Sequence, residues 1–377
     1  MKRVLIVSPS NKGTIALRTE DLYKSFLRDK DVVVKIVYLY KFTDGFDIGD
    51  KSFYSPYAKS GLKKIVSLLS EVYWLNKIKK VFRPDVTIST LPICSVINVL
   101  SDNNDKKVGV FRAPYEQLID NTKDSILFLY KYLFPKLDKL VGVSRQVTQS
   151  MRQHFPGIPA DRLTTIYNAF FSDEIRNMAL EKLDSLEEEK LFENKIILSV
   201  GRIEKLKAPD RLIKAYCASN LCKKYHLVYI GNDTNHLQSD LANLAKDNGV
   251  ERFVHFLGAK KNPYRYMKRA SFFASSSTSE GLPGVHIESM LVGTPIVSTN
   301  SSYGVWEVLS ATDNYTEDFR DIFVALNGII TSNCVDEDVN IANLARAFDL
   351  METHHFDAEF EFEKKICPED IVKQYIG

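Results

Sequence analysis

The stretch Ser276–Glu307, SSTSEGLPGVHIESMLVGTPIVSTNSSYGVWE, decides the fold of the second half of the chain. An apolar run at 271–274 precedes it and predicts a short buried strand. Pro283 suits the first turn of a helix, because its missing N–H would have no partner there anyway. The helix is expected to reach about Leu291 and to stop at the Gly-then-Pro signal of 293–295. A new strand follows, so this is strand–helix–strand sequence of the α/β class.

The start of this predicted helix has the chemistry of an anion site. Free backbone N–H groups and the positive end of the helix dipole would face the crevice at the strand end. Glu280 stands before the helix and Glu288 inside it, with seven residues between them. Carboxylates are suited to accept hydrogen bonds from sugar hydroxyls, so the pattern predicts a nucleotide sugar as ligand. The expected backbone contacts come from Gly281, Leu282, Pro283, Gly284 and Val285.

A pair of cations stands upstream, in the loop after the predicted strand 196–200. Gly201 ends that strand, and Arg202 and Lys207 follow it five residues apart. Two cations at the carboxyl end of a strand can clamp a diphosphate and stabilise its charge as it leaves. The other interpretation is that Arg202 and Lys207 are ordinary surface cations of a loop. The anion site at 281–285 favours the clamp.

Further turns of the second half could contribute to the same site. Gly231 ends the predicted strand 226–230. The segment from Leu257 to Lys261 follows another short strand, and a nucleotide base could stack or pair there. A turn without ligand contact is equally compatible with this pattern.

The first half predicts a doubly wound parallel sheet, because its strands alternate with helices. After the first strand, Gly13 ends a turn that either contacts a phosphate or is simply tight. A charged helical link at 171–195 marks a domain boundary, and 377 residues suffice for two α/β domains. The predicted strands are 3–8, 32–40, 85–89, 107–111 and 140–143.

Charge is distributed unevenly along the chain. Residues 1–170 contain 27 Lys and Arg against 16 Asp and Glu, a net charge of +11, and the remainder has a net charge of −9. A polyanionic partner is therefore expected for the first half alone. That half has no recognisable nucleic-acid module, so nucleic acid is not predicted. The segments 60–83 and 125–140 mix lysines with aromatic residues: they pack on the sheet, and one of them could also lie on an anionic membrane.

Composition and residue spacing indicate the cellular compartment of the protein and whether it needs a metal. The five cysteines have no CxxC spacing, which argues against a disulfide framework or a zinc ribbon and favours a reducing cytoplasm. The first residues have too short an apolar run for a signal peptide, and no run approaches the roughly 18 residues that span a bilayer. The D-x-D spacings at 29–31 and 336–338 are interpreted as surface turns, so no metal is predicted. The cysteines are Cys94, Cys217, Cys222, Cys334 and Cys367.

Taken together, these segments resemble the retaining glycosyltransferases of family 4, whose fold is GT-B. The resemblance rests on VGRIEKLKAPDRLIKAY (200–216), FLGAKKNPYRYMKRA (256–270), SEGLPGVHIESMLVGTPIVST (279–299) and GVWEVL (304–309), with weaker pieces in the first half. It implies two Rossmann-like domains facing a cleft. An acceptor domain at 1–170 would be joined through the linker 171–195 to a donor domain at 196–359. The terminal helix of 360–377 would cross back to the first domain.

The resemblance also implies roles for single residues. Arg202 and Lys207 would hold the donor diphosphate, Glu280 would lie beside the donor sugar, and Glu288 would bind the ribose. Such enzymes usually need no metal and retain the anomeric configuration. Many relatives have a histidine facing the acceptor where this chain has Arg112, so Arg112 and Gly13 are assigned to the acceptor side. The chain also departs from the family pattern at Ala208, where a glycine is usual, and at Asn232–Asp233.

The function expected from the resemblance is transfer of a sugar, from UDP rather than GDP, to a glycan or lipid-linked acceptor. Surface polysaccharide synthesis, such as that of capsule or O-antigen, is the expected setting. The transferred sugar would be a hexose or an N-acetylhexosamine. The enzyme would act in the cytoplasm, at the inner face of the cell membrane. Two other classes remain open: a nucleotide-sugar 2-epimerase of the same architecture, and a non-catalytic partner subunit.

Overall fold

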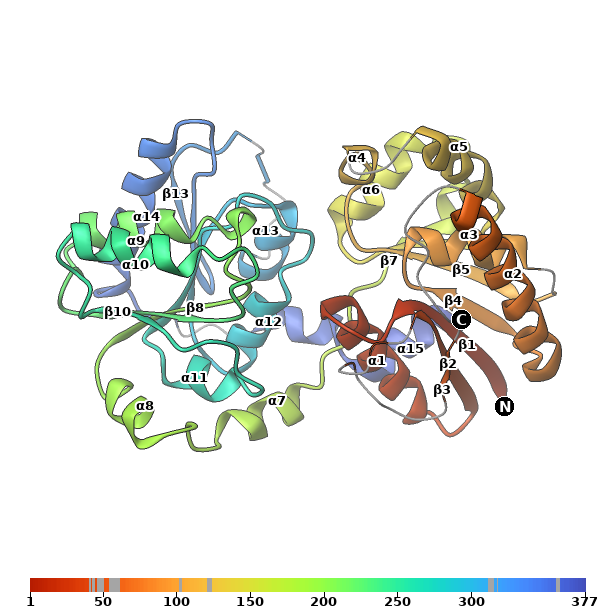
Figure 1. Ribbon diagram of the computed structural model, residues 1–377, viewed down its shortest axis with the longest axis horizontal. Coiled ribbons are helices and arrows are strands. Elements are labelled where there is room, and N and C mark those ends of the chain that lie inside the picture. The colour runs from red at the N-terminus through yellow and green to blue at the C-terminus, as the bar shows by residue number, and fades with distance from the viewer. Residues whose placement is uncertain are drawn as a thin grey trace. The chain divides into compact units, whose positions relative to one another are not determined.

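The structure is a computed structural model (Figure 1), and it describes the whole chain except residues 41, 43–44, 46–50, 54–61, 102–103, 121–123, 311–314, 317 and 357–359. The chain divides into two compact units. Unit 1 comprises Met1–Phe171 and Lys365–Gly377, and unit 2 is the continuous segment Ser172–Lys364. Each unit has its own sheet, with helices between most of the successive strands.

Unit 1 is built on a seven-stranded sheet of order β3-β2-β1-β4-β5-β6-β7, in which all pairs are parallel. The interior strand β1 carries the apolar run Val4–Val7, which is fully buried, as expected for a strand covered on both faces. The strands are β1 (Lys2–Ser10), β2 (Val32–Tyr40), β3 (Lys51–Phe53), β4 (Val86–Ser89), β5 (Lys106–Phe111), β6 (Lys139–Gly142) and β7 (Leu163–Thr165). The predicted doubly wound sheet is confirmed, and the order changes direction between β1 and β4.

The helices of unit 1 cover both faces of this sheet. They are α1 (Thr14–Leu27), α2 (Leu62–Phe82), α3 (Pro92–Leu100), α4 (Tyr115–Asp120), α5 (Asp124–Leu133), α6 (Arg145–His154) and α15 (Pro368–Ile376). Helix α15 comes from the far end of the sequence and packs on α1, where the rings of Phe26 and Tyr375 are 6.4 Å apart. The return of the chain is anchored by Phe170 N–H, which donates to Ile366 O at 3.0 Å.

Unit 2 is built on a second seven-stranded sheet, of order β10-β9-β8-β11-β12-β14-β13. Among the described strands of this sheet, β13 runs antiparallel to its neighbour β14 and the other pairs are parallel. The sequence predicts the turn at Asn327–Gly328 and the strand after it, but not β13 before it. The strands are β8 (Ile196–Val200), β9 (His226–Ile230), β10 (Val254–Phe256), β11 (Phe272–Ser275), β12 (Ile296–Thr299), β13 (Ile322–Ala325) and β14 (Gly328–Thr331).

The helices of unit 2 are α7 (Ser172–Ala179), α8 (Leu186–Leu191), α9 (Pro209–Ala218), α10 (Gln238–Asp247), α11 (Tyr264–Arg269), α12 (Gly284–Leu291), α13 (Tyr303–Leu309) and α14 (Glu337–Met351). The main core of this unit lies between the sheet and helices α9, α10 and α14, around Tyr216, Phe272 and Phe348. None of the described helices is both long and apolar enough to span a membrane.

The segment expected to be a linker belongs to unit 2. It forms α7 and α8, and side chains from the 260–262 loop hold it there. Lys260 Nζ contacts Glu188 Oε1 at 2.6 Å, and Asn262 Nδ2 donates to Met178 O at 2.8 Å. The first crossing between the units therefore falls at 171–172 and the second at 364–365. Residues 360–364, expected to belong with unit 1, lie in unit 2 because the 3₁₀ helix η4 (Glu361–Lys365) is tied to α7 through Arg176 and Glu363.

Candidate functional site

The predicted site residues of unit 2 come from loops at the carboxyl ends of β8, β9 and β11, which are neighbours in the sheet. Gly201 N–H donates to Ile230 O at 2.9 Å, so the end of β8 runs beside the end of β9. A side chain on Gly231 would place its Cβ 1.7 Å from Gly201 O. Glycine at 231 is therefore required by the close approach of the two loops.

Lys207 and Glu280 meet although 73 residues separate them in the sequence. The Lys207 ammonium forms an ion pair with the Glu280 carboxylate, and 31% and 17% of these two side chains are exposed. Together with Gly201, Arg202 and Val285 they line a hollow of about 30 Å³. The structure thus gathers the predicted cations, the first predicted glutamate and the start of α12 around one point.

Arg202 lies at the rim of this hollow. Its side chain is 62% exposed, and Nη2 lies 3.0 Å from Glu204 Oε1. The guanidinium end of this pair is open to solvent and so is accessible to a ligand, whereas the Glu204 side chain is 13% exposed. The predicted two-cation clamp has both members at the same edge, each now paired with a carboxylate of the protein.

Polar contacts fix the loop that carries Lys207. The loop is a 3₁₀ turn, η3 (Lys205–Lys207), and Ala208 after it is in the left-handed region at φ 43°. Ser276 Oγ lies 2.8 Å from both Lys207 O and Ala208 O, and Thr278 N–H donates to Leu206 O at 2.9 Å. These serine and threonine contacts were not singled out from the sequence. A run of small hydroxyl residues directly after a buried strand was the available signal.

Helix α12 begins at Gly284, with Pro283 as its N-cap, and ends at Leu291 as predicted. Glu288 lies within the helix and is 5% exposed. His286 is fully buried, and a ring nitrogen lies 2.8 Å from Ser298 Oγ. Burial, and next the nearby charge of Lys207, lower the pKa of His286 to about 3. His286 is therefore neutral in the folded protein and packs between α12 and the sheet.

The loop after β10 continues the same edge. Leu257 N–H donates to Tyr229 O and Gly231 N–H donates to Gly258 O, both at 2.9 Å. The loop therefore follows the end of β9 closely. Gly258 adopts φ 68°, which favours glycine. Leu257 and Gly231 consequently lie at the same edge of the sheet as Gly201. For the segment from Leu257, the sequence leaves open either contact with a nucleotide base or a turn without ligand contact.

Unit 1 holds the two residues assigned to the acceptor side. Gly13 precedes α1 with φ 86°, a backbone conformation that favours glycine. Arg112 follows β5, and its Nη1 donates to Asn168 Oδ1 at 2.6 Å. Burial lowers the pKa of Arg112 to about 10, so it remains charged at neutral pH. Arg112 is thus engaged with the chain after β7.

The two D-x-D stretches have local roles. Asp29 Oδ1 accepts from Asp31 N–H at 2.9 Å, and Asp336 caps α14 by accepting from the N–H groups of Asp338 and Val339. The first stretch is a turn, as predicted, whereas the second is the start of α14 (Glu337–Met351), because Asp336 caps that helix and the next two residues belong to it. Within the described part of the chain, no group of three or more His, Cys, Asp or Glu side chains is placed to hold a metal ion.

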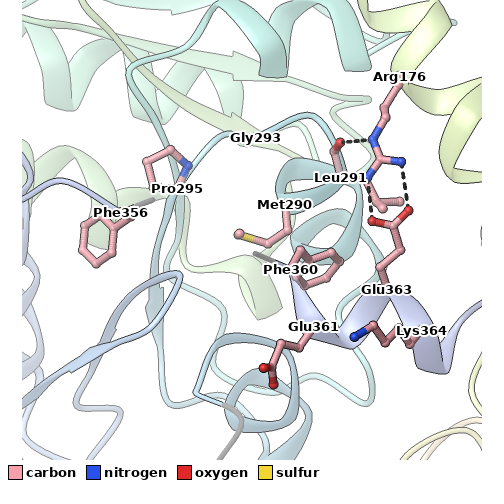
Figure 2. Close-up of a pocket in the computed structure, with 10 residues that line it drawn as sticks. All are labelled: Arg176, Met290, Leu291, Gly293, Pro295, Phe356, Phe360, Glu361, Glu363 and Lys364. Atoms are coloured by element: carbon pink, nitrogen blue, oxygen red, sulfur yellow. Dashed lines mark hydrogen bonds and ion pairs between the residues drawn. The ribbon is translucent and has the colours of Figure 1, made fainter. Parts of the chain in front are cut away.

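A larger cavity, of about 500 Å³, lies at the other end of α12 (Figure 2). Its wall combines apolar residues, including Met290, Pro295 and Phe360, with charged residues, including Glu361 and Lys364. At its edge, the Arg176 guanidinium holds both oxygens of Glu363 and donates through Nε to Leu291 O at 3.2 Å. Lys207 and Glu280 lie near the opposite end of the helix, at its start, and Glu288 lies within it.

Known proteins resemble the chain in sequence. Residues 184–349 match the profile of the family "Glycosyl transferases group 1". An uncharacterized glycosyltransferase of Methanocaldococcus jannaschii is 23% identical over 310 residues, covering 74% of this chain and 75% of that protein. The N-acetylgalactosamine-N,N'-diacetylbacillosaminyl-diphospho-undecaprenol 4-alpha-N-acetylgalactosaminyltransferase of Campylobacter jejuni is 34% identical over 181 residues, covering 48% of this chain and 46% of that protein.

Solved structures resemble the chain over its full length. Anabaena HepE, crystallised with UDP and glucose, matches with a TM-score of 0.68 and 16% identity, covering 100% of this chain and 95% of that one. The lipopolysaccharide glycosyltransferase WaaG matches with a TM-score of 0.62 and 14% identity, covering 99% and 94%. The chain therefore has the GT-B fold. With the group 1 profile on unit 2, these likenesses support a glycosyltransferase.

Proposed function

We propose that this chain is a retaining family 4 glycosyltransferase that moves a sugar from a UDP-sugar to a glycan or lipid-linked acceptor in surface polysaccharide synthesis. The observation that carries the proposal is the meeting of Lys207 and Glu280, with Arg202 at the rim, where α12 begins. A cation pair, a carboxylate and a helix start at one point suit a diphosphate joined to a sugar.

The donor would bind by exchanging partners with the protein. Its diphosphate takes Lys207 from Glu280 and Arg202 from Glu204, since phosphate accepts several charge-assisted hydrogen bonds. The freed Glu280 then accepts hydrogen bonds from the donor sugar. The backbone of 281–285 contacts sugar and phosphate, Glu288 binds the ribose, and the loop at Leu257 meets the base.

Catalysis in this proposal is stabilisation of the leaving diphosphate. As the bond from the anomeric carbon to the phosphate oxygen breaks, negative charge grows where Arg202, Lys207 and the start of α12 already place positive potential. These groups do the work that a metal ion does in other transferases, so we propose a metal-independent enzyme. The acceptor hydroxyl attacks the same face that the diphosphate leaves, and the anomeric configuration is retained.

The identity of the substrates rests on relatives. HepE binds UDP and glucose, which supports a UDP-sugar carrying a hexose or an N-acetylhexosamine. The Campylobacter enzyme is named for a diphospho-undecaprenol acceptor, which supports a lipid-linked glycan. A lipid-linked acceptor would bring the enzyme to the cytoplasmic face of the membrane, with Gly13 and Arg112 on the acceptor side.

Two helices of unit 1 support contact with such a membrane. On α2, Leu69 and Tyr73 are 63% and 62% exposed, and Lys77 Nζ lies 4.8 Å from the centre of the Tyr73 ring. On α5, Phe128 and Tyr132 are 71% and 61% exposed. Exposed aromatic and aliphatic residues beside lysines are typical of helices that lie on anionic bilayers.

Sedimentation with vesicles tests this contact. The wild-type protein is expected to bind phosphatidylglycerol vesicles and not phosphatidylcholine vesicles, and Tyr73→Ser with Phe128→Ser is expected to abolish binding. Leu180→Ser is the matched control, because Leu180 is 73% exposed but belongs to unit 2. Equal binding of all three proteins would contradict the assignment of the surface.

The proposed reaction is tested by incubating the protein with a panel of nucleotide sugars, with and without membrane extract. Free UDP with a glycosylated lipid product is the expected result. Release of GDP instead would correct the donor. An epimerised sugar still linked to its nucleotide would favour the 2-epimerase, and binding without turnover would favour a partner subunit.

A further inference from the structure

We infer that Arg211 is a positioning residue that holds the loops carrying Lys207 and Glu280 in the arrangement that receives the donor diphosphate. This inference rests on the proposed function. Arg211 is on α9 and is 4% exposed. Its guanidinium contacts two regions that are distant from each other in the sequence: the loop after β11, and the loop after β14 with the first turn of α14 that follows it.

The contacts of Arg211 use its planar shape. Nε and Nη2 donate to the two carboxylate oxygens of Glu337 at 2.8 and 2.6 Å. Nη1 donates to Asn333 Oδ1 at 2.9 Å and to Ser276 O at 3.3 Å. Four acceptors in different directions suit a guanidinium and exceed what one lysine ammonium can satisfy.

Two relays connect this guanidinium to the donor loops. The backbone carbonyl of Ser276 accepts a hydrogen bond from Arg211. The side-chain hydroxyl of Ser276 donates to Lys207 O and Ala208 O. Asn333 accepts from Arg211, and its Nδ2 donates to Thr278 O at 2.8 Å. Residues 276 and 278 thus lie between Arg211 on one side and the η3 loop on the other.

The η3 loop, which carries Lys207, needs such support. Ala208 is in the left-handed region, where a residue with a Cβ is strained, and its contact with Ser276 favours that conformation. Removing the guanidinium leaves Ser276 O and Asn333 Oδ1 without their partner. The loop can then relax, and the Lys207 ammonium moves away from the point where it meets Glu280.

A simple stabilising ion pair between α9 and α14 is the other interpretation, and local measurements separate the two. In Arg211→Lys, the amides of Lys207, Ala208 and Thr278 are expected to exchange hydrogen about tenfold faster or more. UDP affinity, measured by calorimetry, is expected to fall by a similar factor. A stabilising pair alone would lower the melting temperature and leave both quantities unchanged, which would overturn the inference.

Two further variants complete the test. Arg346→Lys is the matched control, since Arg346 is an exposed arginine of α14 paired with Asp321 at 3.2 Å, and it is expected to behave as wild type. Asn333→Ala removes one relay and one acceptor of Arg211 but keeps the buried guanidinium paired with Glu337, so it reports on the inference if Arg211→Lys does not fold. Its expected effect has the same direction and is smaller.

The exchange measurement needs no ligand. If the wild-type protein binds no nucleotide, the proposed function fails. The exchange of Lys207, Ala208 and Thr278 in the variants then still supports or overturns the role of Arg211.

Discussion

The two ends of helix α12 differ in a way that shows how a site is recognised. At its start, opposite charges from separate loops meet around a hollow of about 30 Å³. At its end lies a cavity of about 500 Å³ whose wall mixes apolar and charged residues. The larger cavity is far from the predicted chemistry. Convergence of charged groups at the carboxyl ends of parallel strands, and not volume, marks the candidate site.

The ion pairs at the two ends also differ. Lys207 and Glu280 meet through a single ammonium contact that a ligand can replace. Arg176 holds both oxygens of Glu363 and also the carbonyl of Leu291, at the carbonyl-rich end of the helix. The first pair is suited to exchange and the second to hold α7, α12 and η4 together. Substitutions at the two ends should therefore affect different properties.

The largest effect is expected at the start of α12. Arg202→Ala or Glu280→Ala should lower turnover of the active nucleotide sugar by about 10²–10³-fold, because each removes a group that acts on the reacting centre. The circular dichroism spectrum should stay that of wild type. Lys205→Ala, an exposed lysine of the same loop, is the control. A near-normal rate in either variant would refute the role given to that residue.

A substitution at the other end should change stability and leave the donor site intact. Arg176→Ala removes three hydrogen bonds at a half-exposed position and should lower the free energy of unfolding by about 1 kcal/mol. Urea unfolding measures this change. UDP affinity should remain within about twofold, a difference under half a kcal/mol. A large loss of affinity would mean that the two ends are coupled.

The pH dependence of stability should report the same ion pair. Burial raises the pKa of Glu363, but hydrogen bonds from Arg176 and Ser172, together with the charge of Arg176, outweigh burial and lower the pKa below its ordinary value. A lowered folded-state pKa stabilises above the unfolded value of about 4.3, and the stabilisation is lost as pH falls through the folded-state value. The stability difference between wild type and Arg176→Ala should therefore shrink between pH 6 and pH 3. A constant difference would contradict the assignment.

The smallest effect is expected at Ala208. Its φ of 43° strains a residue with a Cβ, so Ala208→Gly should raise the free energy of unfolding by less than about 1 kcal/mol. Thermal unfolding measures the change. Destabilisation would show that contacts of the Ala208 methyl group outweigh the strain.

The sequence predicted those parts of the fold and site that depend on local pattern and parallel-sheet geometry. The bounds of α12 follow from Pro283 and the Gly293 stop, and the meeting of Lys207 with Glu280 follows because neighbouring parallel strands end at one edge. Strand β13 was missed, because its half-buried pattern becomes a strand only through antiparallel pairing with β14. Arg211 was missed because its partners lie 65 to 126 residues away and no local pattern reports them.

The path of the chain also determines when each unit can be completed during synthesis. Unit 2 is one uninterrupted segment, whereas unit 1 receives α15 only after the 193 residues of 172–364 have been made. Elongation over that length takes about 10–40 s. Throughout this interval the side of α1 that carries Phe26 has no α15 to cover it. The nascent chain consequently exposes an apolar helix face for tens of seconds, and a ribosome-associated chaperone has that time to bind it.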